Sequence, residues 1–183
     1  MKAHKFFRPG ARGTLTQHPW PAPPSTADGE ATWLQAADGP LSPCRNGLHA
    51  CRIDQLGFWI ADELWEVELG DERIETRHAV IARRARLVRR IDAWQTSAAH
   101  ELTRACRDRA RARAEQTPDL SPRAHELLES TEQFARDGKT ALTAYVAALL
   151  CAALGPADQQ LATFDAERRA QSLLLAAAAG LEP

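Results

Sequence analysis

Residues 64–69 read Leu-Trp-Glu-Val-Glu-Leu, so apolar and acidic side chains alternate along this stretch. Alternation with a period of two predicts a β-strand that has one apolar and one polar face. The polar face carries Glu66 and Glu68. Two carboxylates on one face can perform acid–base chemistry if that face lines a pocket. The simpler interpretation is a solvated edge strand whose charges discourage aggregation, and the choice depends on what covers the face.

The composition of the chain differs on the two sides of this strand. Residues 1–75 hold 7 basic and 11 acidic residues together with most of the glycines, whereas the remainder holds 16 and 13 and is rich in the helix formers Ala, Leu, Arg and Glu. We therefore expect an α+β protein. Residues 1–76 should form a small unit of a few short strands and one short helix, with a proline-rich loop at 18–43. This unit should pack against a helical unit at 77–183 that contains three or four helices.

The helical unit is predicted from apolar spacing and from helix-start signals. A long helix is expected from near His78, because apolar residues recur at helical intervals from Val80 to Ala105. Ser121 precedes a proline, which is a strong start signal for the next helix. Two more helices are expected at 140–154 and 157–179.

Charge and hydropathy restrict the partners of the chain. Ten arginines lie between Arg83 and Arg113 against three acidic residues, and such a stripe could bind phosphates. However, these arginines would surround a helix without interleaved aromatic rings, so the sequence disfavours nucleic-acid binding.

The chain contains no stretch of about 18 apolar residues, so the sequence predicts no membrane span. The N-terminus lacks the apolar core of a secretory signal, and we therefore expect a cytoplasmic protein. The alanine-rich end of the last helix could join two copies in a homo-oligomer through the helical unit.

One cluster of residues has the chemistry of a metal site. Cys44, His49 and Cys51 lie within eight residues of one another, and thiolate and imidazole are both zinc ligands. The spacing differs from the paired Cys-x-x-Cys pattern of zinc proteins. The alternative is a pair of buried thiols beside a strand, with His49 hydrogen-bonded to the backbone.

Three stretches resemble an uncharacterised domain family of bacteria and phages. They are Lys-Ala-His-Lys-Phe-Phe at 2–7, Cys-Arg-Asn-Gly-Leu-His-Ala-Cys at 44–51, and the Glu-Val-Glu strand. The resemblance covers about residues 1–92 and departs from the family pattern at Phe6, where a small residue is usual. It implies a fold unit and brings no activity with it.

The same half of the chain is also remotely similar to ADP-ribosyltransferase-like folds. That similarity implies NAD as cofactor, held by His4 or Arg8 on the first strand. His49 would stack on the nicotinamide, and Glu66 or Glu68 would orient the ribose and stabilise the positive charge that forms when nicotinamide leaves.

Three hypotheses follow for the function. The leading one is an NAD-using transferase or glycohydrolase centred on His49 and Glu66. The alternatives are a zinc-binding module and a non-catalytic interaction scaffold. They differ in whether His49, Cys51 and Glu66 converge on one open cleft.

Overall fold

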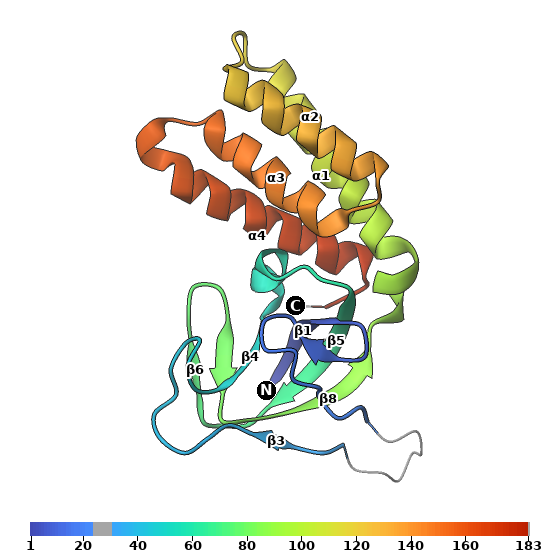
Figure 1. The fold of residues 1–183 in the computed structure, drawn as a ribbon, viewed down its shortest axis with the longest axis vertical. Coiled ribbons are helices and arrows are strands. Elements are labelled where there is room, and N and C mark those ends of the chain that lie inside the picture. Colours follow the sequence, from blue (N-terminus) through green and yellow to red (C-terminus); the bar gives the residue numbers. More distant parts are fainter. Residues whose placement is uncertain (24–30, 183) are drawn as a thin grey trace. The chain divides into compact units, whose positions relative to one another are not determined.

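The computed structural model describes residues 1–23 and 31–182 and divides the chain into two compact units, Met1–Gln95 and Thr96–Pro183 (Figure 1). The first unit consists of short strands and one 3-10 helix, and the second consists of helices. The predicted α+β class is confirmed. The predicted packing of one unit against the other stays a prediction.

The strands of the N-terminal unit form two antiparallel sheets. The larger sheet has the order β2-β1-β5-β8-β3 and the smaller has the order β4-β7-β6. The strands of the larger sheet are β1 Lys2–Arg8, β2 Arg12–Gly13, β3 Leu34–Gln35, β5 Glu63–Leu69 and β8 Arg84–Arg90. Those of the smaller sheet are β4 Leu48–Ala50, β6 Arg73–Glu75 and β7 Val80–Ala82. An antiparallel bridge between His4 and Cys51 links β1 to the end of β4.

The strand predicted at 64–69 is confirmed as β5, but it is an inner strand. It pairs with β1 on one side and with β8 on the other. The solvated-edge interpretation is therefore wrong. Glu66 forms an ion pair with Arg89 at 3.0 Å, and Glu68 forms one with Arg86 at 2.6 Å. Opposite charges that face each other on neighbouring strands stabilise a sheet. Both acidic residues therefore have basic partners on the adjacent strand.

The long helix predicted from His78 is wrong over its first part. Residues of β7 and β8 are extended, a π-helical turn follows at Trp94–Ala98, and the first α-helix begins only at Ala99. Ala85 and Leu87 point into the core while arginines alternate with them, so the period is two. Tertiary pairing with β5 overrides the helix propensity of arginine. The arginine-rich stretch is thus divided between a strand and a helix.

The loop predicted at 18–43 contains a short strand, β3, and its residues 24–30 lie outside the described residues. Trp20 is buried and packs edge-on against Phe7, with ring centroids 5.3 Å apart. The guanidinium groups of Arg84 and Arg86 lie 4.7 and 4.9 Å from the ring centre of Trp33. Both indoles therefore hold this segment to the sheet, as large aromatic surfaces do when they leave water.

The core of the N-terminal unit lies on the inward faces of the two sheets. Alternate residues of β1, namely Ala3 and Phe7, belong to it, as do Val67 of β5 and Leu87 of β8. Glu63 at the start of β5 accepts hydrogen bonds from the backbone of the turn after β1, from the Gly10 and Ala11 amides at 3.0 and 3.1 Å.

The C-terminal unit has four α-helices, at the upper limit of the predicted number. They are α1 Ala99–Glu115, α2 Pro122–Arg136, α3 Thr140–Ala153 and α4 Gln160–Ala178. Ser121 caps α2 as predicted, because its hydroxyl accepts from the Ala124 amide at 3.2 Å. Buried Glu167 of α4 accepts two hydrogen bonds from Arg109 of α1, at 3.1 and 2.8 Å. In the described part of the chain, no helix has the length and hydropathy needed to cross a membrane.

We expect a fragment of residues 1–76 to stay unfolded, because it lacks β8, which supplies the second neighbour of β5. A fragment of residues 1–95 keeps β7 and β8 and should unfold cooperatively. Circular dichroism during heating distinguishes the two fragments. A cooperative melt of the shorter fragment, or a random-coil spectrum of the longer one, would contradict the strand order described above.

Candidate functional site

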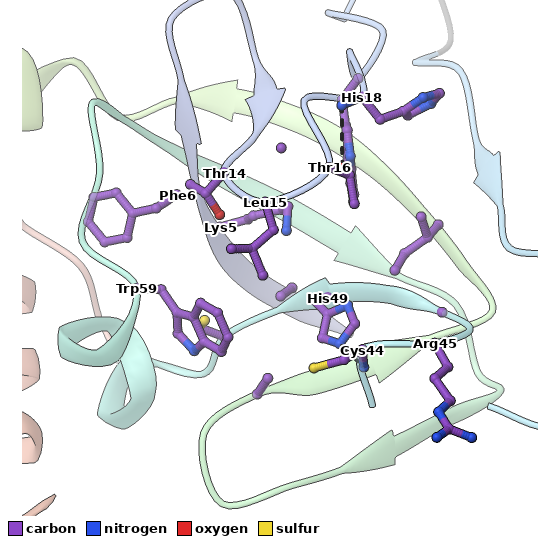
Figure 2. A pocket seen from close by; sticks show the side chains of 17 residues that line it. Lys5, Phe6, Thr14, Leu15, Thr16, His18, Cys44, Arg45, His49 and Trp59 are labelled. Carbon is purple, nitrogen blue, oxygen red and sulfur yellow. Dashed lines mark hydrogen bonds between the residues drawn. The ribbon is translucent and has the colours of Figure 1, made fainter. Parts of the chain in front are cut away.

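A cavity of about 350 Å³ lies in the N-terminal unit, partly open to solvent (Figure 2). Its wall is formed by β1, β4 and the segments that flank them, including residues 13–20 and 44–51. Most of the lining is apolar or aromatic, and the lining includes no aspartate or glutamate. The ionisable side chains of the wall are Lys5, His18, Cys44, Arg45, His49 and Cys51. A cavity with few polar groups in an apolar wall is typical of small-molecule sites.

Lys5 reaches into this cavity because of its register on β1. It pairs with Trp65 of β5 and alternates with the core residues Ala3 and Phe7, so it lies on the inward face. Its ammonium group lies 5.3 Å from the ring centre of Phe7 and 5.4 Å from that of Trp20. Within the described residues no carboxylate forms an ion pair with it. The amine is therefore stabilised by aromatic rings in place of an acidic partner.

The surroundings of Lys5 also change its acidity. The side chain as a whole is half-buried, but its amine lies among protein atoms that withdraw it from water. This burial lowers the pKa of Lys5 to about 8, and the nearby Cys51 thiol opposes the shift only in part. Desolvation disfavours the charged form of an amine. A sizeable fraction of Lys5 is thus uncharged at mildly alkaline pH.

His49 lies on β4 and lines the same cavity (Figure 2). Its Nε2 accepts a hydrogen bond from the Cys44 amide at 3.3 Å, which places the ring proton on Nδ1 in the neutral form. Burial lowers the pKa of His49, the charge of Lys5 lowers it further, and a backbone hydrogen bond with Gly47 opposes both. The imidazole is therefore neutral near pH 7 and close enough to Lys5 for their charges to interact.

Two indoles form part of the apolar wall. Trp20 packs against Phe7 from the segment that follows β2. Trp59 follows the 3-10 helix Ile53–Phe58, and its Nε1 donates to the carbonyl oxygen of His78 at 2.6 Å. Because that donor is already satisfied, the Trp59 ring contributes apolar surface to the cavity.

The three residues predicted to bind zinc do not form a metal site. Cys44 is exposed, whereas Cys51 is buried, and burial raises the pKa of the Cys51 thiol to about 12. Over residues 1–23 and 31–182 no group of three histidine, cysteine, aspartate or glutamate side chains could hold a metal ion. The alternative of two buried thiols beside a strand is correct for Cys51 and wrong for Cys44, which is exposed, and His49 is hydrogen-bonded to the backbone as that alternative expected.

The structure does not bring Glu66 and Glu68 to the cavity. Glu66 pairs with His4 and Glu68 with Lys2 in the β1–β5 ladder, so these acids lie on the face of the sheet opposite to Lys5. His49 and Glu66 are therefore not assembled as the enzyme hypothesis requires.

The two residues predicted to hold NAD are also separate from the cavity. His4 is 3% exposed, neither ring nitrogen has a hydrogen-bond partner among the described residues, and burial lowers its pKa to about 4 against the opposing charge of Glu66. Arg8 is exposed at the end of β1 and is not part of the cavity wall. His4 is therefore an uncharged packing residue.

The sequence reasoning missed Lys5 and the two indoles. The usable signal for Lys5 was the alternation Ala3, Lys5, Phe7, which puts the amine on the apolar face of its strand. Trp20 packs against Phe7 and also lines the cavity.

No family model, curated protein or solved structure matches this chain. The two resemblances in the N-terminal half therefore stay predictions, as does the homo-oligomer through the helical unit.

We expect Gly47→Ala to destabilise the turn that presents His49. Gly47 has φ of +133°, and a Cβ there would collide with Cγ2 of Ile81 on the paired strand β7. Strain and overpacking together should lower the free energy of unfolding by about 3 kcal/mol. Gly10→Ala is the matched control, since Gly10 has φ of +78° in open space and should lose only about 1 kcal/mol. If urea unfolding shows that Gly47→Ala and Gly10→Ala lower the free energy of unfolding equally, the close approach to Ile81 is unimportant.

We expect iodoacetamide to modify Cys44 well before the other cysteines at pH 8. Cys44 is exposed, whereas burial raises the pKa of Cys51 and Cys106 to about 12 and that of Cys151 to about 11. The thiolate is the reactive form, so the three buried thiols should stay unmodified in the folded protein. Peptide mass spectrometry over time measures this order, and Cys44→Ser should abolish the early product. Early modification of Cys51 would mean that its side chain is open to solvent.

Proposed function

We propose that the N-terminal unit binds a small molecule that combines a flat ring with an oxygen-bearing polar group. The observation that carries this proposal is the Lys5 amine, which points into an aromatic cavity without a carboxylate partner. The ring would lie against the indoles, and the oxygen would meet Lys5.

Electrostatics favour such a ligand. A charged or polar group in apolar surroundings is costly unless a partner compensates for it. The rings of Phe7 and Trp20 compensate for the Lys5 charge in part. A ligand oxygen would complete the compensation, and a hydrogen bond to a charged group contributes about 1.5–3 kcal/mol. The neutral ring of His49 adds surface beside Lys5, since its nitrogens are hydrogen-bonded to the backbone of Cys44 and Gly47.

The size of the cavity limits the ligand. Its volume of about 350 Å³ is near the small end of ligand pockets, which span roughly 300–1,000 Å³. One ring system with a short substituent suits this volume. NAD would place only its nicotinamide or adenine end inside.

Binding without bond cleavage is the function that we infer. ADP-ribosyl transfer and glycohydrolysis both need a carboxylate near the ribose to stabilise the developing positive charge. The cavity wall supplies His49 and Lys5 but no acid, because Glu66 and Glu68 lie on the opposite face of β5. NAD accordingly enters as a candidate ligand, and its hydrolysis is not part of the proposal.

We expect 2-naphthoate, a flat anion, to bind the protein, and Lys5→Met to weaken this binding by about tenfold or more. Calorimetry with 2-naphthoate, nicotinamide and NAD makes the comparison. His49→Ala should weaken binding less, because the imidazole is neutral. Glu66→Gln and Glu68→Gln are the matched controls on the other face and should leave the affinity unchanged.

Two results would count against this proposal. One is the absence of heat with all three compounds at millimolar concentration. The other is an affinity for 2-naphthoate that falls with Glu66→Gln as much as with Lys5→Met. The second result would move the site to the opposite face of the sheet.

A further inference from the structure

We propose that Lys5 forms a reversible imine with a small aromatic aldehyde that enters the cavity. This inference rests on the proposed function, because the aldehyde must occupy the same cavity. It specifies the chemical class of the polar group that meets Lys5 as a reactive carbonyl.

The position of Lys5 meets the first requirement, which is a nucleophile aimed at a bound ligand. Figure 2 shows the Lys5 side chain among the residues that line the cavity. The inward register opposite Trp65 holds it there. An aromatic aldehyde stacked on the indoles would bring its carbonyl carbon to this amine, and such positioning accelerates bond formation.

The second requirement is an uncharged amine, since only the free lone pair attacks a carbonyl. An amine in apolar surroundings without an acidic partner loses its proton easily, and catalytic Schiff-base lysines are activated in this way. Lys5 has both features, and burial lowers its pKa to about 8. No described carboxylate forms an ion pair with it that would hold the proton or block the nitrogen.

The reaction balances without an added oxidant or reductant. The Nζ lone pair forms a bond to the carbonyl carbon while the C=O π pair moves to oxygen, and a proton passes from nitrogen to oxygen to give a carbinolamine. The C–O bond then breaks, the oxygen leaves as water with a second proton from the nitrogen, and a C=N bond remains. One amine and one aldehyde thus give one imine and one water. Hydrolysis reverses the sequence.

The composition of the chain makes the proposal directly testable. The protein has three lysines, namely Lys2, Lys5 and Lys139. Lys2 and Lys139 form surface ion pairs with Glu66 and Asp137, each at 3.5 Å. Both serve as internal references for an ordinary surface amine in the same sample.

The experiment treats the full chain with limiting 2-naphthaldehyde and sodium cyanoborohydride at pH 7.5, followed by peptide mass spectrometry. Reduction converts an imine to a stable secondary amine, whereas a thiohemiacetal at Cys44 is not retained. We expect Lys5 to be labelled about tenfold faster than Lys2 or Lys139. Lys5→Arg, which keeps the charge, should abolish the fast product, and Lys2→Arg should leave it unchanged. Labelling of Lys5 at or below the rate of the two surface lysines would overturn the proposal.

A parallel titration with 2-naphthalenemethanol separates this proposal from the preceding one. The alcohol has the same ring but cannot form an imine, and it should compete with labelling at Lys5. If the alcohol binds the cavity and the aldehyde gives no adduct at Lys5, the imine is refuted while ligand binding stands. If neither compound binds, both proposals fail.

Discussion

The register between β1 and β5 places Lys5 at the cavity, and neither Glu66 nor Glu68 is part of the cavity wall. Lys5 lies opposite Trp65, so it shares the inward face with Ala3 and Phe7, while His4 lies opposite Glu66 on the other face. Because side chains alternate along a strand, a shift of one residue would exchange these two sets. Burial of Val67 and Leu69 in the core opposes such a shift, and β8 secures β5 from its other side. The cavity therefore depends on a pairing that the hydrophobic core enforces.

An inward lysine costs stability, and the sign of its pH dependence follows from its pKa. Folded Lys5 has a pKa of about 8, whereas an amine in water has one near 10.5. Between these values the unfolded chain binds a proton that the folded chain has released, so the contribution of Lys5 to stability rises with pH over this range. Below pH 8 the full cost is present. Perturbed groups of this kind cluster at functional sites, and a ligand oxygen beside Lys5 would offset the cost.

Much of the fold was predictable because local patterns and tertiary partners agree there. The alternation at 64–69 predicts β5, and the Ser121 cap predicts α2. The strand β8 was not predictable in this way, because its arginines favour helix and Leu87 fits either period. What makes it a strand is pairing with β5. The face of β5 that meets the cavity likewise depends on partners far away in the sequence, so Glu66 could not be assigned a side from local pattern alone.

The most direct measurement of the central claim is the titration of the Lys5 amine by NMR, with ¹³C-labelled lysine and assignment through Lys5→Arg. The account predicts that the Lys5 Cε signal changes with a midpoint near pH 8, because the amine points into an apolar cavity without an acidic partner. A midpoint near 10.5 would place this side chain in water and would contradict the inward register, the binding site and the imine together.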